Sequence, residues 1–233
     1  MHTDNFDGSH PCEIDLVPTD LSKYESIKII NTGGFADIYT VKEKETEETY
    51  VAKVFRKDDD YVYDDLMRTR IFYSEVEIMS KLNSPLFVKF VEFGLHGFMS
   101  EKRSTIIMEY YPNGTLHDLL RSLKSGLIPK EWNETRELII IYLIALGMMY
   151  LHSKNYIHRD LKPHGIYLDD YLLPKIGDFS TTIRADNRIK DNIIGDMSYI
   201  APEAMSGEEY ATKAVDVYAF AIIVYEIVTH REP

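Results

Sequence analysis

The chain has 233 residues, of which 45% are hydrophobic and 27% charged, a composition typical of a folded, soluble protein rather than a disordered one. The formal net charge of −12, with no cluster of basic residues, argues against nonspecific binding to nucleic acid or to an anionic membrane, because attraction to phosphate requires positive charge. A single cysteine excludes an internal disulfide, and the N-terminus does not resemble a signal peptide. We therefore expect an intracellular, cytoplasmic protein.

Residues 1–24 are polar and aperiodic, and we expect them to form a flexible leader. Residues 26–41 alternate in polarity on both sides of Gly33 and Gly34, a pattern that predicts two strands joined by a tight turn. The apolar run 50–55 predicts a third strand.

Two charged residues are expected at apolar positions in the first half of the chain. Residues 64–82 carry apolar side chains at helical spacing, and Glu75 falls on the same face of this predicted helix. Lys53 lies within the third predicted strand. Burial of either charge alone would be costly, so the two could neutralise each other in the interior. In the alternative interpretation, Lys53 extends to solvent and Glu75 lies at the edge of the helix face.

The middle of the chain changes from strands to helices. Residues 87–94 and 104–111 predict two more strands, and residues 112–114 predict a turn after them. Residues 115–123 begin with a capping-box pattern, and the apolar run 138–151 is short for a membrane span and predicts a buried helix. A strand-rich first part followed by a helix-rich second part predicts an α+β protein with two lobes and a cleft between them.

Three short motifs follow in the second part: HRDLKP at 158–163, GDFS at 177–180 and APE at 201–203. Taken alone, Asp178 in the second motif is more typical of a turn, and a lone histidine is usually packed or solvated. The order and spacing of all the elements, from the glycine turn and the two charged residues to these motifs, carry the functional hypothesis.

The ordered set resembles a eukaryotic protein kinase domain of the serine/threonine type, from about residue 25 to the end of the chain. Within that group, residues 108–116 and 216–229 resemble the tyrosine-kinase-like members. The resemblance implies a bilobal fold with a kinase N-lobe at 25–110 and a helical C-lobe at 111–233, which lacks the last helices of the family.

The resemblance also implies how phosphate would be transferred. ATP and Mg²⁺, or Mn²⁺ in its place, would be the cofactors, and Asp178 would be the metal ligand. Lys53, held by Glu75, would contact the α- and β-phosphates. Asp160 would orient the acceptor hydroxyl, and Lys162 would steady the γ-phosphate.

An adenine site is implied as well. Met108 would be its gatekeeper, the backbone around Glu109 and Tyr111 would form the hinge, and Tyr167 would form the floor. The strands above the nucleotide would contribute further contacts, from Ile30, Gly33, Ile38 and Val51.

Several positions depart from the family pattern. Gly165 stands where the family has an asparagine metal ligand, a loss that could cost about 2 to 4 kcal/mol of transition-state stabilisation, or about 30- to 1000-fold in rate. Tyr167 replaces a smaller aliphatic residue and would either stack on the base or fill its place. Asp196 replaces a threonine and would either divert Lys162 from phosphate or take up a proton. Ser180 replaces the glycine after Asp-Phe.

Two further expectations concern regulation and packing. No Ser, Thr or Tyr lies at 184–195, and we hypothesise that Asp191 or a neighbouring acid takes the place of a phosphate opposite Arg159. Thr181 and Thr182 would remain as phosphorylation sites. The last helix, 215–228, is apolar nearly all round and should be covered on several sides.

The sequence thus predicts a protein kinase domain that transfers the γ-phosphate of ATP to serine or threonine of a protein substrate, with reduced efficiency. The alternative is a pseudokinase, an ATP-sensing or protein-binding scaffold whose partner is a regulatory protein. A third interpretation is a fragment without an independent fold. Under all three interpretations, the acidic composition excludes nucleic acid and membrane as partners.

Overall fold

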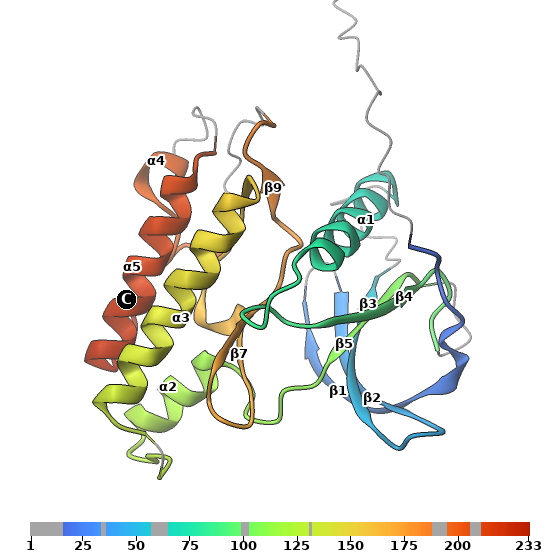
Figure 1. Ribbon diagram of the computed structural model, residues 1–233, viewed down its shortest axis with the longest axis horizontal. Helices are drawn as coiled ribbons and strands as arrows, with labels where there is room; N and C mark the ends of the chain where they lie inside the picture. Colours follow the sequence, from blue (N-terminus) through green and yellow to red (C-terminus); the bar gives the residue numbers. More distant parts are fainter. Residues whose placement is uncertain are drawn as a thin grey trace, which may run out of the picture.

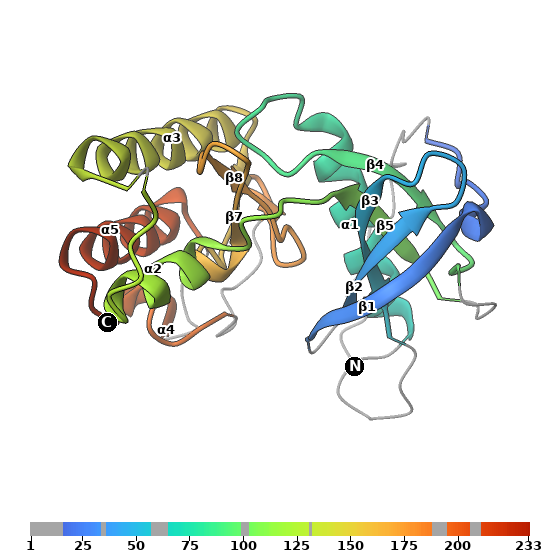
Figure 2. The ribbon, with the colours of Figure 1, turned by 90° about the horizontal axis from the view of Figure 1, so that it is seen from below.

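A computed structural model of the chain describes residues 16–33, 36–56, 65–98, 103–130, 132–187, 195–205 and 211–233. An antiparallel sheet with one helix comes first, and a group of helices with short strand pairs follows (Figure 1). The two parts lie side by side as separate lobes (Figure 2). This arrangement confirms the predicted α+β, two-lobed fold.

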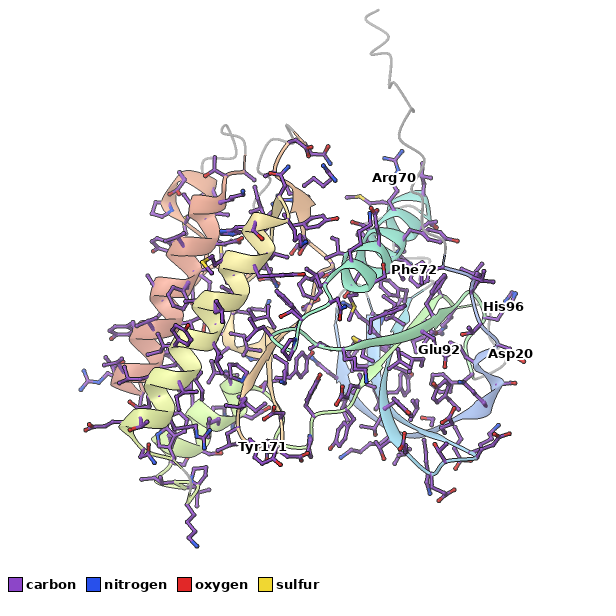
Figure 3. All side chains as sticks on the ribbon, viewed as in Figure 1. Asp20, Arg70, Phe72, Glu92, His96 and Tyr171 are labelled. Carbon is purple, nitrogen blue, oxygen red and sulfur yellow. The ribbon has the colours of Figure 1, made fainter. Side chains whose placement is uncertain are left out.

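The first lobe is built on a five-stranded antiparallel sheet with the strand order β1-β2-β3-β5-β4. Helix α1 (Asp65–Lys81) lies beside the sheet and carries Phe72 (Figure 3). The ring of Phe72 contacts those of Phe55 and Phe93 edge-to-face. Such contacts bury large apolar areas and fix the helix on the sheet. The strands are β1 (Tyr24–Thr32), β2 (Ala36–Glu43), β3 (Thr49–Phe55), β4 (Phe90–Gly94) and β5 (Thr105–Glu109).

Residues 16–24 are attached to the sheet, which corrects the expectation of a flexible leader for this stretch. Thr19 donates its N–H and its hydroxyl to the carbonyl of Phe93, at 2.8 and 3.1 Å, along the outer edge of β4. Leu21 is only 1% exposed and fills the space beside Gly94, where an added Cβ would lie 2.7 Å from its side chain. A paired edge and a buried leucine hold the segment in place. Residues 1–15 lie outside the described residues.

The second lobe consists mainly of helices. The predicted capping box is present at the start of α2, where Asp118 N–H donates to Thr115 Oγ1 and Thr115 N–H donates to Asp118 Oδ2. Short strand pairs hold the loops between the helices: β6 (Tyr156–Ile157) with β9 (Ile183–Arg184), and β7 (Ile166–Leu168) with β8 (Pro174–Ile176). The helices are α2 (Leu116–Lys124), α3 (Glu134–Ser153), α4 (Pro202–Met205) and α5 (Lys213–Thr229).

Helix α3 contains the predicted apolar run and lies beside α5 (Figures 1 and 2). By length and composition it could cross a membrane, with a mean hydropathy of 1.3. In the lobe, however, Ile140 and Ile144 on its inner face are fully buried. Gly147 allows a close approach to β8, because an added Cβ would lie 2.6 Å from Ile176 Cδ1. The prediction of a buried helix therefore holds for one face of α3 only, because Leu138, Tyr142 and Met149 on its other side are 66%, 65% and 63% exposed.

Helix α5 differs from its expectation. Its inner residues, such as Ile223 and Ile227, are fully buried, but Val217 and Val228 are 60% and 62% exposed. One side of α5 is therefore not covered by any residue that the structure describes.

The described residues form three apolar clusters, and the largest of them extends through both lobes. It includes Val76 and Met79 of α1, Phe179 in the loop after β8, and Ile144 and Ile223 of the helical lobe. Because one cluster crosses the boundary, side chains that face the cleft from the two lobes are positioned by the same packed core.

Candidate active site

A cleft of about 500 Å³ receives side chains from both lobes, and cavities of this size hold small ligands and cofactors. From the first lobe come the turn after β1, strands β2, β3 and β5, and helix α1. From the second come the loops after β6 and β8. The lining residues include Gly33, Ile38, Lys53, Glu75, Met108, Asp160, Lys162, Tyr167 and Asp178.

Lys53 and Glu75 meet at the back of this cleft. Lys53 Nζ lies 2.7 Å from Glu75 Oε1 and 3.0 Å from Asp178 Oδ1. Lys53 and Glu75 are 7% and 1% exposed, which excludes the alternative in which Lys53 extends to solvent. The buried ammonium group of Lys53 therefore links strand β3 to helix α1 and to the loop after β8.

The electrostatics of this cluster follow from burial and charge. Burial alone would lower the pKa of Lys53, but the carboxylates of Asp178 and Glu75 raise it overall. The Lys53 ammonium holds the pKa of Asp178 well below its usual range. Burial raises the pKa of Glu75, and Lys53 opposes this effect. Lys53 and Asp178 thus stay charged at neutral pH.

Asp216 of α5 holds the HRDLKP loop in place through hydrogen bonds to its backbone. The carboxylate of Asp216 accepts the backbone N–H groups of His158 and Arg159, both at 2.8 Å, and lies 2.8 Å from His152 Nε2. Arg159 has a left-handed φ of 71°, which a residue with a side chain rarely adopts without such support. The loop presents Asp160 to the cleft.

Asp160 and Lys162 form an ion pair, with Lys162 Nζ 2.8 Å from Asp160 Oδ2. The carboxylate of Asp196, which we expected near Lys162, instead accepts the N–H of Ser198 at 3.2 Å. Within the described residues, Asp196 and Lys162 form no ion pair. The Asp196 N–H points to Asp160 Oδ1, at 3.4 Å, so the expected competition of two carboxylates for one lysine is not seen.

The sequence around Asp178 adopts a constrained turn. Asp178 has a left-handed φ of 61°, and the hydroxyl of Ser180 donates to Asp178 Oδ1 at 3.0 Å. The Thr181 hydroxyl donates to the His158 carbonyl at 3.0 Å, and Thr182 is 4% exposed. Thr182 is therefore poorly accessible for phosphorylation in this conformation. Asp191 lies outside the described residues, as does Gly34 of the glycine turn.

The residues expected around adenine are only partly brought together. Neither Ile30, which is 45% exposed on β1, nor Val51, which is buried on β3, lines the cleft. Glu109 and Tyr111 do not line this cleft, and they instead line a separate cavity of about 600 Å³ together with Phe87 and Lys89. The ring of Tyr111 lies 6.3 Å from that of Tyr167, so the expected hinge and floor remain adjacent.

A family model for the protein kinase domain matches residues 24–233. The chain belongs to the protein kinase family. Its described elements therefore form a kinase N-lobe and a kinase C-lobe, and the cleft between them is the place at which the family binds nucleotide.

Individual kinases show the same relationship. The chain is 32% identical over 215 residues to an Aurora kinase of Saccharomyces cerevisiae, covering 91% of this chain and 54% of the relative. It is 30% identical over 217 residues to a protein of Dictyostelium discoideum named probable serine/threonine-protein kinase PLK (91% and 20%), and 28% identical over 218 residues to Rho-associated protein kinase 1 of Mus musculus (90% and 15%). The domain is thus related to serine/threonine kinases, and it spans about half the length of the Aurora kinase it matches.

The structure shows two cleft features of this kinase domain that the sequence reasoning missed. His164 lies at the cleft and stacks on His117 of α2, with ring centroids 3.7 Å apart. Gly195 packs closely against the HRDLKP loop, because a Cβ added to Gly195 would lie 2.9 Å from Asp160 Oδ1. Its φ is 113°. The sequence shows a glycine directly before Asp196 and could have pointed to Gly195. No sequence pattern predicts contact between two histidines that are 47 positions apart.

Proposed function

We propose that this domain is an active serine/threonine protein kinase that transfers the γ-phosphate of ATP to a protein substrate with reduced efficiency. The observation that carries the proposal is the meeting of Lys53, Glu75 and Asp178 in one cleft with the Asp160–Lys162 pair. Phosphate transfer needs held phosphates, a compensating cation and an aligned hydroxyl. These five side chains supply groups for each of those tasks.

The donor set fits ATP with Mg²⁺. Two ammonium groups, on Lys53 and Lys162, can face phosphate oxygens. Asp178 Oδ2 accepts no hydrogen bond from any residue the structure describes, and its side chain is 35% exposed. A hard divalent cation prefers such a carboxylate oxygen, so Asp178 is the metal ligand we propose. When bound, Mg²⁺ would offset the charge on the transferred phosphate.

The protein groups then have separate roles. Glu75 fixes the position of the Lys53 ammonium, which holds the α- and β-phosphates. Asp160 accepts the proton of the substrate hydroxyl, or aligns it, from a loop whose backbone Asp216 holds. Lys162 offsets the negative charge of Asp160 and contacts the γ-phosphate.

Reduced efficiency follows from Gly165. The position faces Asp178, since an added Cβ would lie 3.7 Å from Asp178 Cβ, but glycine offers no ligand. We propose that a second cation is held weakly or not at all, which lowers the rate rather than preventing transfer.

The test is transfer of labelled phosphate from ATP to a mixed serine and threonine peptide pool, with Mg²⁺ and then Mn²⁺, by the chain and by its Asp160→Ala variant. We expect transfer by the chain that the variant loses. Equal signals from two folded proteins would contradict the proposal.

A pseudokinase is the second candidate, and Tyr167 is the observation that favours it. This larger side chain lines the cleft at the expected adenine floor. If ATP with Mg²⁺ stabilises the protein against heat while no transfer is seen, the domain binds nucleotide without catalysis. If ATP has no effect on a protein that melts cooperatively, the result favours a pseudokinase that does not bind nucleotide.

A further inference from the structure

The hydroxyl of Ser180 is bonded to the carboxylate that we propose as the metal ligand. Ser180 Oγ donates to Asp178 Oδ1 at 3.0 Å, and Lys53 Nζ donates to the same oxygen, also at 3.0 Å. We propose that Ser180 is a positioning residue that fixes the Asp178 carboxylate and leaves Oδ2 directed at a single divalent cation. This inference rests on the proposed nucleotide function.

The backbone at Asp178 is set by groups outside its side chain. Its left-handed φ of 61° is rarely adopted by residues other than glycine. The Thr181 hydroxyl bonds the His158 carbonyl, and the Thr182 N–H bonds the Phe179 carbonyl at 3.1 Å. Phe179 itself is 1% exposed. These contacts hold the turn but do not orient the carboxylate.

Two donors on one oxygen do orient it. An aspartate side chain has two torsion angles, and a single hydrogen bond leaves the carboxylate free to turn about that contact. Lys53 approaches from strand β3 and Ser180 from the turn itself, so together they restrict both angles. The remaining oxygen, Oδ2, accepts no hydrogen bond within the described chain, and it is the one available to a cation.

The orientation matters more in this chain because of Gly165. An added Cβ at this position would lie 3.7 Å from Asp178 Cβ, so a side chain at 165 would stand next to Asp178. Without a ligand at 165, Asp178 must hold the cation with less help. Metal affinity falls when groups that orient a ligand are removed, typically by 10-fold or more.

The experiment measures how much Mg²⁺ is needed for ATP to stabilise the protein against heat, at a fixed ATP concentration. We expect Ser180→Ala and Ser180→Gly to require about 10-fold more Mg²⁺ for half of the full shift in melting temperature. Ser180→Thr keeps the hydroxyl and should behave like the unchanged chain. Thr182→Val is the matched control, because it removes a hydroxyl from the same turn that bonds the His158 carbonyl and not Asp178.

Each other outcome overturns a defined statement. If Ser180→Ala and Ser180→Gly need the same Mg²⁺ as the unchanged chain, Ser180 does not position the ligand, and the proposed nucleotide function stands. If Thr182→Val raises the Mg²⁺ requirement equally, the effect reflects a loosened turn, and the positioning role is wrong. If the unchanged chain shows no Mg²⁺-dependent shift, both the positioning role and the nucleotide function fail.

Discussion

Replacing Gly165 by asparagine should raise the rate of phosphate transfer, because it returns a metal ligand to a position that faces Asp178. The substitution is sterically acceptable. An added Cβ would lie 3.4 Å from the Gly177 carbonyl oxygen and 3.7 Å from Asp178 Cβ, which are ordinary van der Waals distances. Position 165 is not among the residues with a left-handed backbone, so a side chain there introduces no backbone strain.

The expected gain follows from the charge that the second cation would stabilise. A ligand that restores about 2 to 4 kcal/mol of transition-state stabilisation raises the rate about 30- to 1000-fold. The effect should appear in the maximal rate and in its dependence on Mg²⁺ concentration, since the added group binds metal and not the substrate.

The assay is steady-state phosphate transfer to a serine and threonine peptide pool over a range of Mg²⁺ concentrations. Gly165→Ala is the control, because its methyl group occupies the same space but cannot bind a cation. We expect the asparagine variant to exceed both the unchanged chain and the alanine variant. An asparagine variant no faster than the alanine variant would refute the argument that the missing ligand limits the rate.

Three further changes test the cluster, the adenine floor and the histidine pair. Lys53→Met should lower the free energy of unfolding in urea by about 3 to 5 kcal/mol, because it leaves the Glu75 carboxylate buried without its partner, and adding Glu75→Gln should recover part of this loss. Tyr167→Leu should weaken ATP binding about 2- to 10-fold in a titration, because the ring lies at the floor of a cleft that stays open and can stack on the base. His164 is exposed to solvent, and its pKa is lowered by partial desolvation and by the nearby His117 and Lys162, against the opposing carboxylates of Asp196 and Asp118, so its neutral form is favoured in the fold. The corresponding stability is present above the unfolded pKa of about 6.5 and is lost as pH falls through the lower folded value, so His164→Asn should reduce the loss of melting temperature between pH 7.5 and pH 5.5.

Each of these has a contrary result. A Lys53→Met variant as stable as the unchanged chain would mean that water reaches Glu75. Tighter ATP binding by Tyr167→Leu would mean that the ring occupies the place of the base. Identical melting curves for His164→Asn and the unchanged chain at both pH values would mean that the stacked histidine does not titrate differently in the fold.

Local periodicity placed Lys53 and Glu75 at apolar positions but left open whether they pair, and the order of the motifs along the chain favoured the pair. A lysine within an apolar strand and a glutamate on the apolar face of a helix each need a partner, and Lys53 and Glu75 are found in contact. The same kind of argument predicted the capping box at Thr115 and Asp118, since both members lie within one helical turn. Short-range patterns of this kind carry most of the fold.

The rest depends on contacts between segments that are distant in sequence or on the direction of one side chain. Leu21 belongs to a polar stretch, and only the space beside Gly94 shows why it is buried. Asp196 was expected to compete for Lys162, but its carboxylate caps the following turn at Ser198. Aspartates commonly bond the backbone two residues ahead, and sequence alone does not decide between that contact and a longer one.

Two of the four departures from the family pattern, Gly165 and Ser180, lie beside Asp178, and this bears on which function is retained. Lys53, Glu75 and the Asp160–Lys162 pair keep their ion pairs. A missing second ligand removes stabilisation that matters most when charge develops on the transferred phosphate. In the proposed function, binding of ATP with one cation would depend instead on Lys53 and on Asp178 Oδ2. The chain should therefore lose more in catalytic rate than in nucleotide affinity, and Mg²⁺-dependent binding of ATP should remain measurable even where transfer is slow.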